Sequence, residues 1–162
     1  MAETEPRGSH RPAITASDVE VVRGTTYPAP LDANSSTRLK RRLGDAFGLT
    51  QFGVNHVILP PGCESSLRHW HATEDEFVYV LKGSPTLVTS AGEQVLQPGK
   101  CAGFQGGCPD GHHLVNRTDE DVEIVEVGTR LNADPCYYPD DDLLWVEEPG
   151  VRAPLHKSGE RY

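Results

Sequence analysis

The feature that most constrains the fold of this chain is a series of short apolar runs, each closed by glycine or proline. One run of alternating residues ends at Pro60 and Pro61, a second ends at Gly83, and a third ends at Pro98 and Gly99. Strand-like segments about 8–12 residues apart, with turn signals between them, are typical of a sandwich or barrel. The 16 glycines and 13 prolines among 162 residues also suit many turns better than long helices. We therefore predict an all-β fold.

The same patterns predict the individual elements. Strands are expected over residues 53–59, 76–82, 100–104, 112–118 and 122–130, and a hairpin over 85–99 turns at Ser90, Ala91 and Gly92. Residues 36–43 are expected to form one or two helical turns. Because no segment repeats, we predict one barrel and not a tandem pair.

Composition divides the chain into three parts. Residues 1–12 are polar and contain proline, which predicts a flexible arm. We place the barrel at residues 13–133, with its core at 50–130. Residues 134–162 are acidic and rich in proline, so we expect an irregular C-terminal tail that packs on the barrel or on a partner subunit.

Charge and apolar content exclude several classes of partner. The formal net charge is −9, and an acidic domain repels nucleic acid phosphates and anionic lipid heads. No apolar stretch approaches the roughly 20 residues that cross a bilayer, and the first residues lack the apolar core of a secretory signal. We therefore expect a cytoplasmic protein that binds neither nucleic acid nor membrane. Its cysteines, none of them in a C-x-x-C pair, are expected to be free thiols: Cys63, Cys101, Cys108 and Cys136.

Metal-capable side chains are densest between residues 68 and 76. Side chains two apart on a strand share a face, so His69 and His71 project together while Trp70 points the other way. Two such imidazoles can close on one ion with bonds of about 2 Å. The polar residues 72–75 form a plausible turn that brings Glu76 back toward the same ion.

A fourth ligand has to come from another part of the chain. The only other imidazole cluster within a strand signal is His112 with His113, and strand alternation places these two on opposite faces. Taken singly, an H-x-H pair is an ordinary surface feature and residues 74–76 read as a solvated acidic turn. The metal hypothesis depends on their combination.

This combination resembles the two sequence motifs of the cupins. The first reads Gly62, six residues, His69-Trp70-His71, four residues, Glu76, six residues and Gly83, with one residue more than usual after the first glycine. The second motif reads GKCAGFQGGCPDGHHLVN over residues 99–116. It departs from the family pattern in having Gln105 where proline is usual and two extra residues before the histidine pair.

The resemblance implies a fold and a ligand set. It covers roughly residues 50–130 and implies a double-stranded β-helix, the cupin jelly-roll barrel, which is often a homodimer with a metal inside one end. The family spacing places the last ligand four residues before Asn116, which selects His112 over His113. The predicted metal ligands are thus His69, His71, Glu76 and His112. The YYPDDD and HKSGERY segments of the tail are similar to those of bacterial single-domain cupins, some of them described as sugar-phosphate isomerases.

The ligand set indicates a class of chemistry. Three imidazoles and one carboxylate leave one or two positions open on an ion of coordination five or six, as catalytic sites do. The donors suit one divalent transition metal, namely iron, manganese, zinc, nickel or cobalt. We predict an enzyme acting on a small polar, oxygen-rich molecule by isomerase or dioxygenase chemistry, with Glu76 a possible participant in catalysis. The alternative is a barrel that binds or senses a small molecule without turnover.

Overall fold

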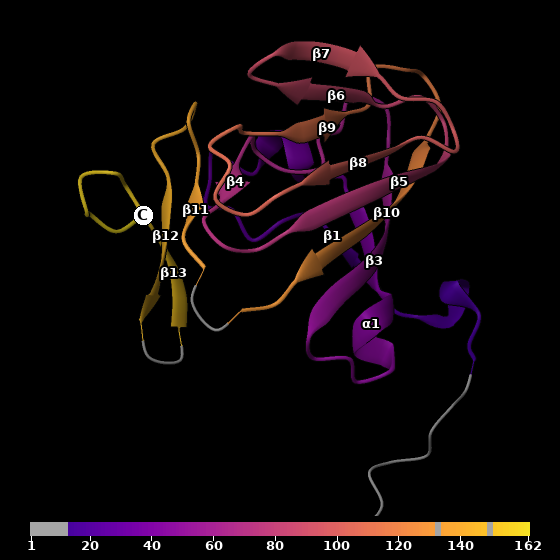
Figure 1. Cartoon of the computed structure of the whole chain (residues 1–162), viewed down its shortest axis with the longest axis horizontal. Coiled ribbons are helices and arrows are strands. Elements are labelled where there is room, and N and C mark those ends of the chain that lie inside the picture. The colour runs from indigo at the N-terminus through magenta and orange to yellow at the C-terminus, as the bar shows by residue number, and fades with distance from the viewer. Residues whose placement is uncertain (1–12, 132–133, 149–150) are drawn as a thin grey trace, which may run out of the picture.

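The computed structural model describes residues 13–131, 134–148 and 151–162 (Figure 1); the arm predicted for residues 1–12 lies outside them. The strands are β1 (Val21–Arg23), β2 (Leu39–Arg42), β3 (Phe52–Leu59), β4 (Trp70–His71), β5 (Glu76–Lys82), β6 (Thr86–Thr89), β7 (Gly92–Val95), β8 (Cys101–Phe104), β9 (His113–Val115), β10 (Val122–Thr129), β11 (Cys136–Tyr137), β12 (Leu144–Glu148) and β13 (Val151–Leu155). The helices are short: the 3-10 turns η1 (Ala16–Asp18) and η2 (Ala33–Ser35), and α1 (Leu43–Ala46).

The strands form three antiparallel sheets that close into a jelly roll. The largest has the order β1-β2-β3-β10-β5-β8, and a small sheet of order β7-β6-β9 lies over it (Figure 1). The third sheet, β13-β12-β11-β4, joins the C-terminal strands to the strand that carries the H-x-H pair. The all-β fold predicted from the turn spacing and the double-stranded β-helix implied by the cupin resemblance are both confirmed.

The core lies between the two facing sheets. Val57, Val80 and Ile124 on the large sheet are fully buried, and they pack in one cluster with Leu87 and Leu114 from the small sheet. These positions alternate with outward residues along each strand, as the period of two requires. Each such side chain contributes roughly 1.5–3 kcal/mol when it is removed from water. This packed end makes a rigid base for the opposite, open end of the barrel.

Most of the predicted strands are found, and one predicted helix is wrong. The runs beginning near residues 53, 76, 101, 113 and 122 form β3, β5, β8, β9 and β10, and the hairpin forms β6 and β7. The segment 36–43, in contrast, contains β2, which pairs with β3 in the register Lys40 to Val57. Leucine, lysine and arginine are good helix formers, but pairing with the sheet overrides this weak local preference.

The segment from Asp134 onward contributes strands that the composition did not predict. Cys136 pairs with His71, and Tyr137 pairs with Trp70, so β11 lies directly against β4. The rings of Trp70 and Tyr137 stack with centroids 4.4 Å apart. Among the described residues, no helix has the length and apolar character needed to cross a bilayer.

Candidate metal centre

The two histidine motifs meet through backbone hydrogen bonds at the open end of the barrel. His69 and His112 form an antiparallel bridge, in which the His69 amide donates to the His112 carbonyl at 3.2 Å and the His112 amide donates back at 2.8 Å. His71 follows two residues later in β4, so its side chain projects to the same side as that of His69. Pairing between distant strands, and not sequence proximity, therefore brings these imidazoles together.

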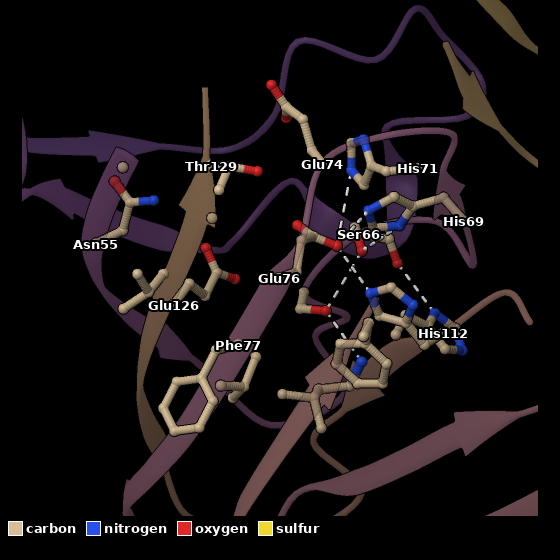
Figure 2. Close-up of a pocket in the computed structure, with 18 of the residues that line it drawn as sticks. Asn55, Ser66, His69, His71, Glu74, Glu76, Phe77, His112, Glu126 and Thr129 are labelled. Atoms are coloured by element: carbon tan, nitrogen blue, oxygen red, sulfur yellow. Dashed lines mark hydrogen bonds and ion pairs between the residues drawn. The ribbon is translucent and has the colours of Figure 1, made fainter. Parts of the chain in front are cut away.

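The carboxylate of Glu76 lies at the centre of these histidines. Its Oε2 is 2.8 Å from Nε2 of His112, 3.4 Å from Nε2 of His69 and 3.7 Å from Nε2 of His71. Figure 2 shows the three imidazoles pointing toward this carboxylate from one side of the pocket. The structure thus brings together all four residues that the sequence singled out, and ligand atoms of His69, Glu76 and His112 lie within 4.8 Å of one another.

Hydrogen bonds fix which nitrogens of two of these histidines remain available. Nδ1–H of His69 donates to the Leu67 carbonyl at 2.9 Å, and Nδ1–H of His71 donates to Oδ2 of Asp134 at 2.5 Å. In the neutral rings each Nε2 then carries a lone pair, and both lone pairs face the Glu76 carboxylate. Acceptors that face one another repel unless a cation or a proton lies between them. The donor set therefore fits a divalent cation held by His69, His71, Glu76 and His112.

The protonation of these groups also suits ligation. Burial alone would raise the pKa of Glu76, but hydrogen bonds from His112 and His69 outweigh it and hold this pKa well below its usual range. Burial lowers the pKa of His112, and the hydrogen bond to Glu76 offsets only part of this shift. For His69, burial would lower the pKa, yet the Glu76 carboxylate raises it overall. Glu76 is therefore ionised and His112 neutral, the forms that bind metal. Without a cation, Glu76 favours a proton on His69, and a metal ion would take the place of that proton.

The choice between His112 and His113 follows from their opposite directions. His112 lies against Glu76, and its ring stacks on Phe104 with centroids 3.4 Å apart. Nδ1–H of His113 donates instead to the Ser66 carbonyl at 3.0 Å, and this nitrogen is 3.6 Å from a Glu64 carboxylate oxygen. The geometry agrees with the family spacing that favoured His112.

Glycines hold the longer loop before His112 in place. The amide of Gly106 donates to Oδ1 of Asp75 at 2.9 Å, and the amide of Gly107 donates to the His71 carbonyl at 2.9 Å. A Cβ on Gly106 would lie 2.5 Å from the Thr73 backbone, so only glycine fits there. These contacts join the two motifs although Gln105 replaces the usual proline.

Asp134 is a site residue that sequence reasoning missed. It lies in the segment expected to be an irregular tail, yet its side chain is buried against the turn after β4. Its Oδ1 accepts hydrogen bonds from the Thr73 amide at 2.7 Å, the Thr73 hydroxyl at 2.6 Å and the Glu74 amide at 3.0 Å, while Oδ2 orients His71. Partners of this kind fix the tautomer and direction of ligating histidines. No local sequence signal marks this residue, because the contact spans 63 positions.

The cluster opens into two adjoining cavities of about 240 and 520 Å³. Both are lined by His69, His71 and Glu76, and by the ion pair in which Nζ of Lys40 lies 2.9 Å from Oε2 of Glu126. Tyr138 lines the larger cavity and stacks on His69 with centroids 5.8 Å apart. The thiol of Cys136 also lies within 4.8 Å of ligand atoms of His69 and His71. The cavities thus combine the candidate ligands with charged, aromatic and thiol groups.

Comparison with known proteins agrees with this geometry. A family profile described as "Cupin domain" matches residues 55–128, and no curated protein matches the chain. A structure described as a sugar phosphate isomerase of a cupin superfamily, from Silicibacter pomeroyi, is 43% identical with a TM-score of 0.88, over 93% of this chain and 96% of that one.

Two further structures extend the comparison. A candidate sugar phosphate isomerase from Acidithiobacillus ferrooxidans is 30% identical with a TM-score of 0.70, over 78% of this chain and 80% of that one. A predicted oxalate decarboxylase from Thermotoga maritima, 20% identical with a TM-score of 0.60 over 74% of this chain and 99% of that one, shares the fold. The spacing of the two histidine motifs, the jelly roll that joins them and these similarities agree: the chain belongs to the cupin superfamily.

Proposed function

We propose that this protein is a metal-dependent isomerase that interconverts the aldose and ketose forms of a sugar phosphate. The observation that carries the proposal is the convergence of three imidazole nitrogens on the Glu76 carboxylate, at the floor of an open cavity. His69, His71, Glu76 and His112 would hold one divalent transition metal, which when bound polarises a carbonyl or hydroxyl oxygen of the substrate.

The cavity supports a sugar phosphate as the substrate class. Its volume of about 520 Å³ is in the range of small-molecule sites. The guanidinium of Arg38 lines it and supplies positive charge for a phosphate. Tyr138 and Trp145 offer aromatic faces to the C–H groups of a sugar. The two structures described above that share at least 30% identity with this chain carry a sugar phosphate isomerase description, which favours isomerisation over oxygen insertion.

Turnover of defined substrates tests the proposal. Protein loaded in turn with manganese, iron, zinc, cobalt or nickel would be incubated with aldose phosphates of three to six carbons, and the products followed by proton and phosphorus NMR. We expect one aldose–ketose pair to interconvert, and the activity to disappear with a chelator and in His69→Ala. Oxygen uptake by the iron form without isomerisation would refute the proposal in favour of a dioxygenase. Binding without turnover would identify a non-catalytic cupin.

Assembly and location stay predictions. The outer face of β5 exposes three large apolar side chains in a row, Phe77, Tyr79 and Leu81. We expect this face to contribute to the homodimer that the family resemblance implies, and sedimentation of the purified protein would test it. The cytoplasmic location expected from the sequence is likewise part of the proposal.

A further inference from the structure

Lys40 and Glu126 are charged residues on the inward face of the large sheet. On β10, Val122 and Ile124 point inward and are fully buried, and Glu126 follows in the same alternation. On β2, Lys40 lies opposite the fully buried Val57 of β3. Apolar side chains would serve a barrel interior better, because a desolvated ion pair adds little net stability. Charged groups that converge in a pocket are candidates for a binding or active site.

The pair faces the candidate metal centre across the pocket. Glu126 lies opposite Val78 and Glu76 lies opposite Gly128, so the two carboxylates are diagonal neighbours on one face of adjacent strands. Such neighbours have Cα atoms about 7–8 Å apart. Figure 2 shows Glu126 on the side of Glu76 away from the histidines.

The backbone leaves room for a substrate between these groups. Gly128 lies directly opposite Glu76 and is outside the positive-φ region, so its conformation does not require glycine. A Cβ there would meet Cγ of Glu76 at 3.7 Å and would project beside the cluster. The lack of a side chain at this position keeps the space between Glu126 and the histidines open for a small molecule.

We propose that Lys40 and Glu126 are the catalytic pair that transfers protons during the isomerisation. This inference rests on the proposed function. The Glu126 carboxylate takes the proton from C2 of the open-chain aldose, and the C–H electron pair becomes the C1–C2 double bond. The carbonyl oxygen on C1 takes a proton from the Lys40 ammonium, which gives an enediol.

The second half of the reaction restores both residues. The Lys40 amine takes the proton from the C2 hydroxyl, a carbonyl forms at C2, and C1 takes the proton held by Glu126. C1 is reduced and C2 is oxidised within one molecule, so no external oxidant or reductant is needed.

Other carboxylates of the cavity walls are already engaged. Glu76 is surrounded by the three histidines, and Glu74 accepts a hydrogen bond from the Leu131 amide at 2.6 Å. Glu126, in contrast, is paired with a lysine that can itself give and take a proton. Its side chain keeps 22% of its surface exposed, as does that of Lys40, so both can reach a bound molecule.

The test combines isotope exchange with matched variants. Wild type, Glu126→Gln, Lys40→Met and the double variant would be assayed with the aldose phosphate panel in D₂O. Glu123→Gln is the control, because Glu123 lies on the same strand but pairs with His56 on the outer face. Metal content and the visible spectrum of the cobalt form report on the metal centre independently of turnover, and melting curves report on folding.

We expect wild type to incorporate some deuterium on C1 of the ketose product, because the partly exposed Glu126 carboxyl group exchanges its proton with solvent before returning it. Glu126→Gln should lower kcat at least 100-fold, within the range for loss of a general base, with metal content and cobalt spectrum unchanged and with wild-type activity in Glu123→Gln. If Glu126→Gln unfolds, the double variant, which leaves no unpaired charge, carries the same expectation.

The outcomes separate this inference from the proposed function. Retention of kcat in Glu126→Gln would overturn the role of the pair while the isomerase proposal stands. Absence of interconversion by wild type with every metal and sugar phosphate would overturn both.

Discussion

Replacing Asp134 by asparagine separates the orientation of His71 from the fold around it. Asparagine keeps one oxygen to accept the three hydrogen bonds from Thr73 and Glu74. It presents an N–H donor, however, where the carboxylate oxygen now accepts from Nδ1–H of His71. Two donors cannot face each other, so His71 must move its proton to Nε2, the nitrogen that faces Glu76.

The expected magnitude follows from this change of tautomer. A protonated Nε2 offers no lone pair, so the cation loses one of its four protein ligands unless the ring reverts to the disfavoured form. Loss of such an orienting partner lowers metal affinity about 10–100-fold, which corresponds to about 1.4–2.8 kcal/mol. In the metal-free protein a hydrogen bond to a charged group is replaced by a neutral one, which lowers the folding stability by about 1 kcal/mol.

Calorimetric titration of metal-free protein with zinc measures the change in affinity, and urea unfolding measures the change in stability. Asp142→Asn is the matched control, since Asp142 accepts a hydrogen bond from Nδ1–H of His156 at 2.8 Å on the surface. We expect this variant to bind zinc like wild type. An Asp134→Asn protein that is folded and binds zinc with undiminished affinity would refute the reasoning.

Three further expectations can be checked with the same protein. His112→Ala should lose the bound metal, whereas His113→Ala should retain it, as elemental analysis would show; the reverse result would contradict the assigned geometry. Adding a chelator should lower the melting temperature, because metal at 100 times its dissociation constant stabilises the fold by about 2.7 kcal/mol; an unchanged melting curve would count against a resident ion. Gly83→Ala should destabilise the protein more than Gly62→Ala in urea unfolding. Both glycines have φ near +76°, where an alanine costs about 1–2 kcal/mol. Only at Gly83 would the added Cβ also clash with a neighbour, because it would lie 2.8 Å from Cγ2 of Val122. Equal losses would show that this clash relaxes freely.

The local sequence pattern was sufficient to predict much of the barrel. The alternation of apolar residues in β3, β5 and β10, and the turns that end these strands, are short-range properties that a strand must satisfy on its own. The same period of two placed His69 and His71 on one face, and the turn before β5 returned Glu76 to them. These features could be predicted because each depends on residues close together in the chain.

The remainder depends on contacts between distant segments, which only the tertiary structure decided. Leu39–Arg42 favours a helix locally and becomes a strand through pairing with β3, and this change brings Lys40 to Glu126. Asp134 reaches His71 because β11 pairs with β4, across 63 residues. Such pairings are selected by burial and hydrogen bonding summed over whole sheets. The amino-acid sequence by itself therefore determined which side chains could bind a metal, whereas the closed barrel decided which other groups orient them and share their cavity.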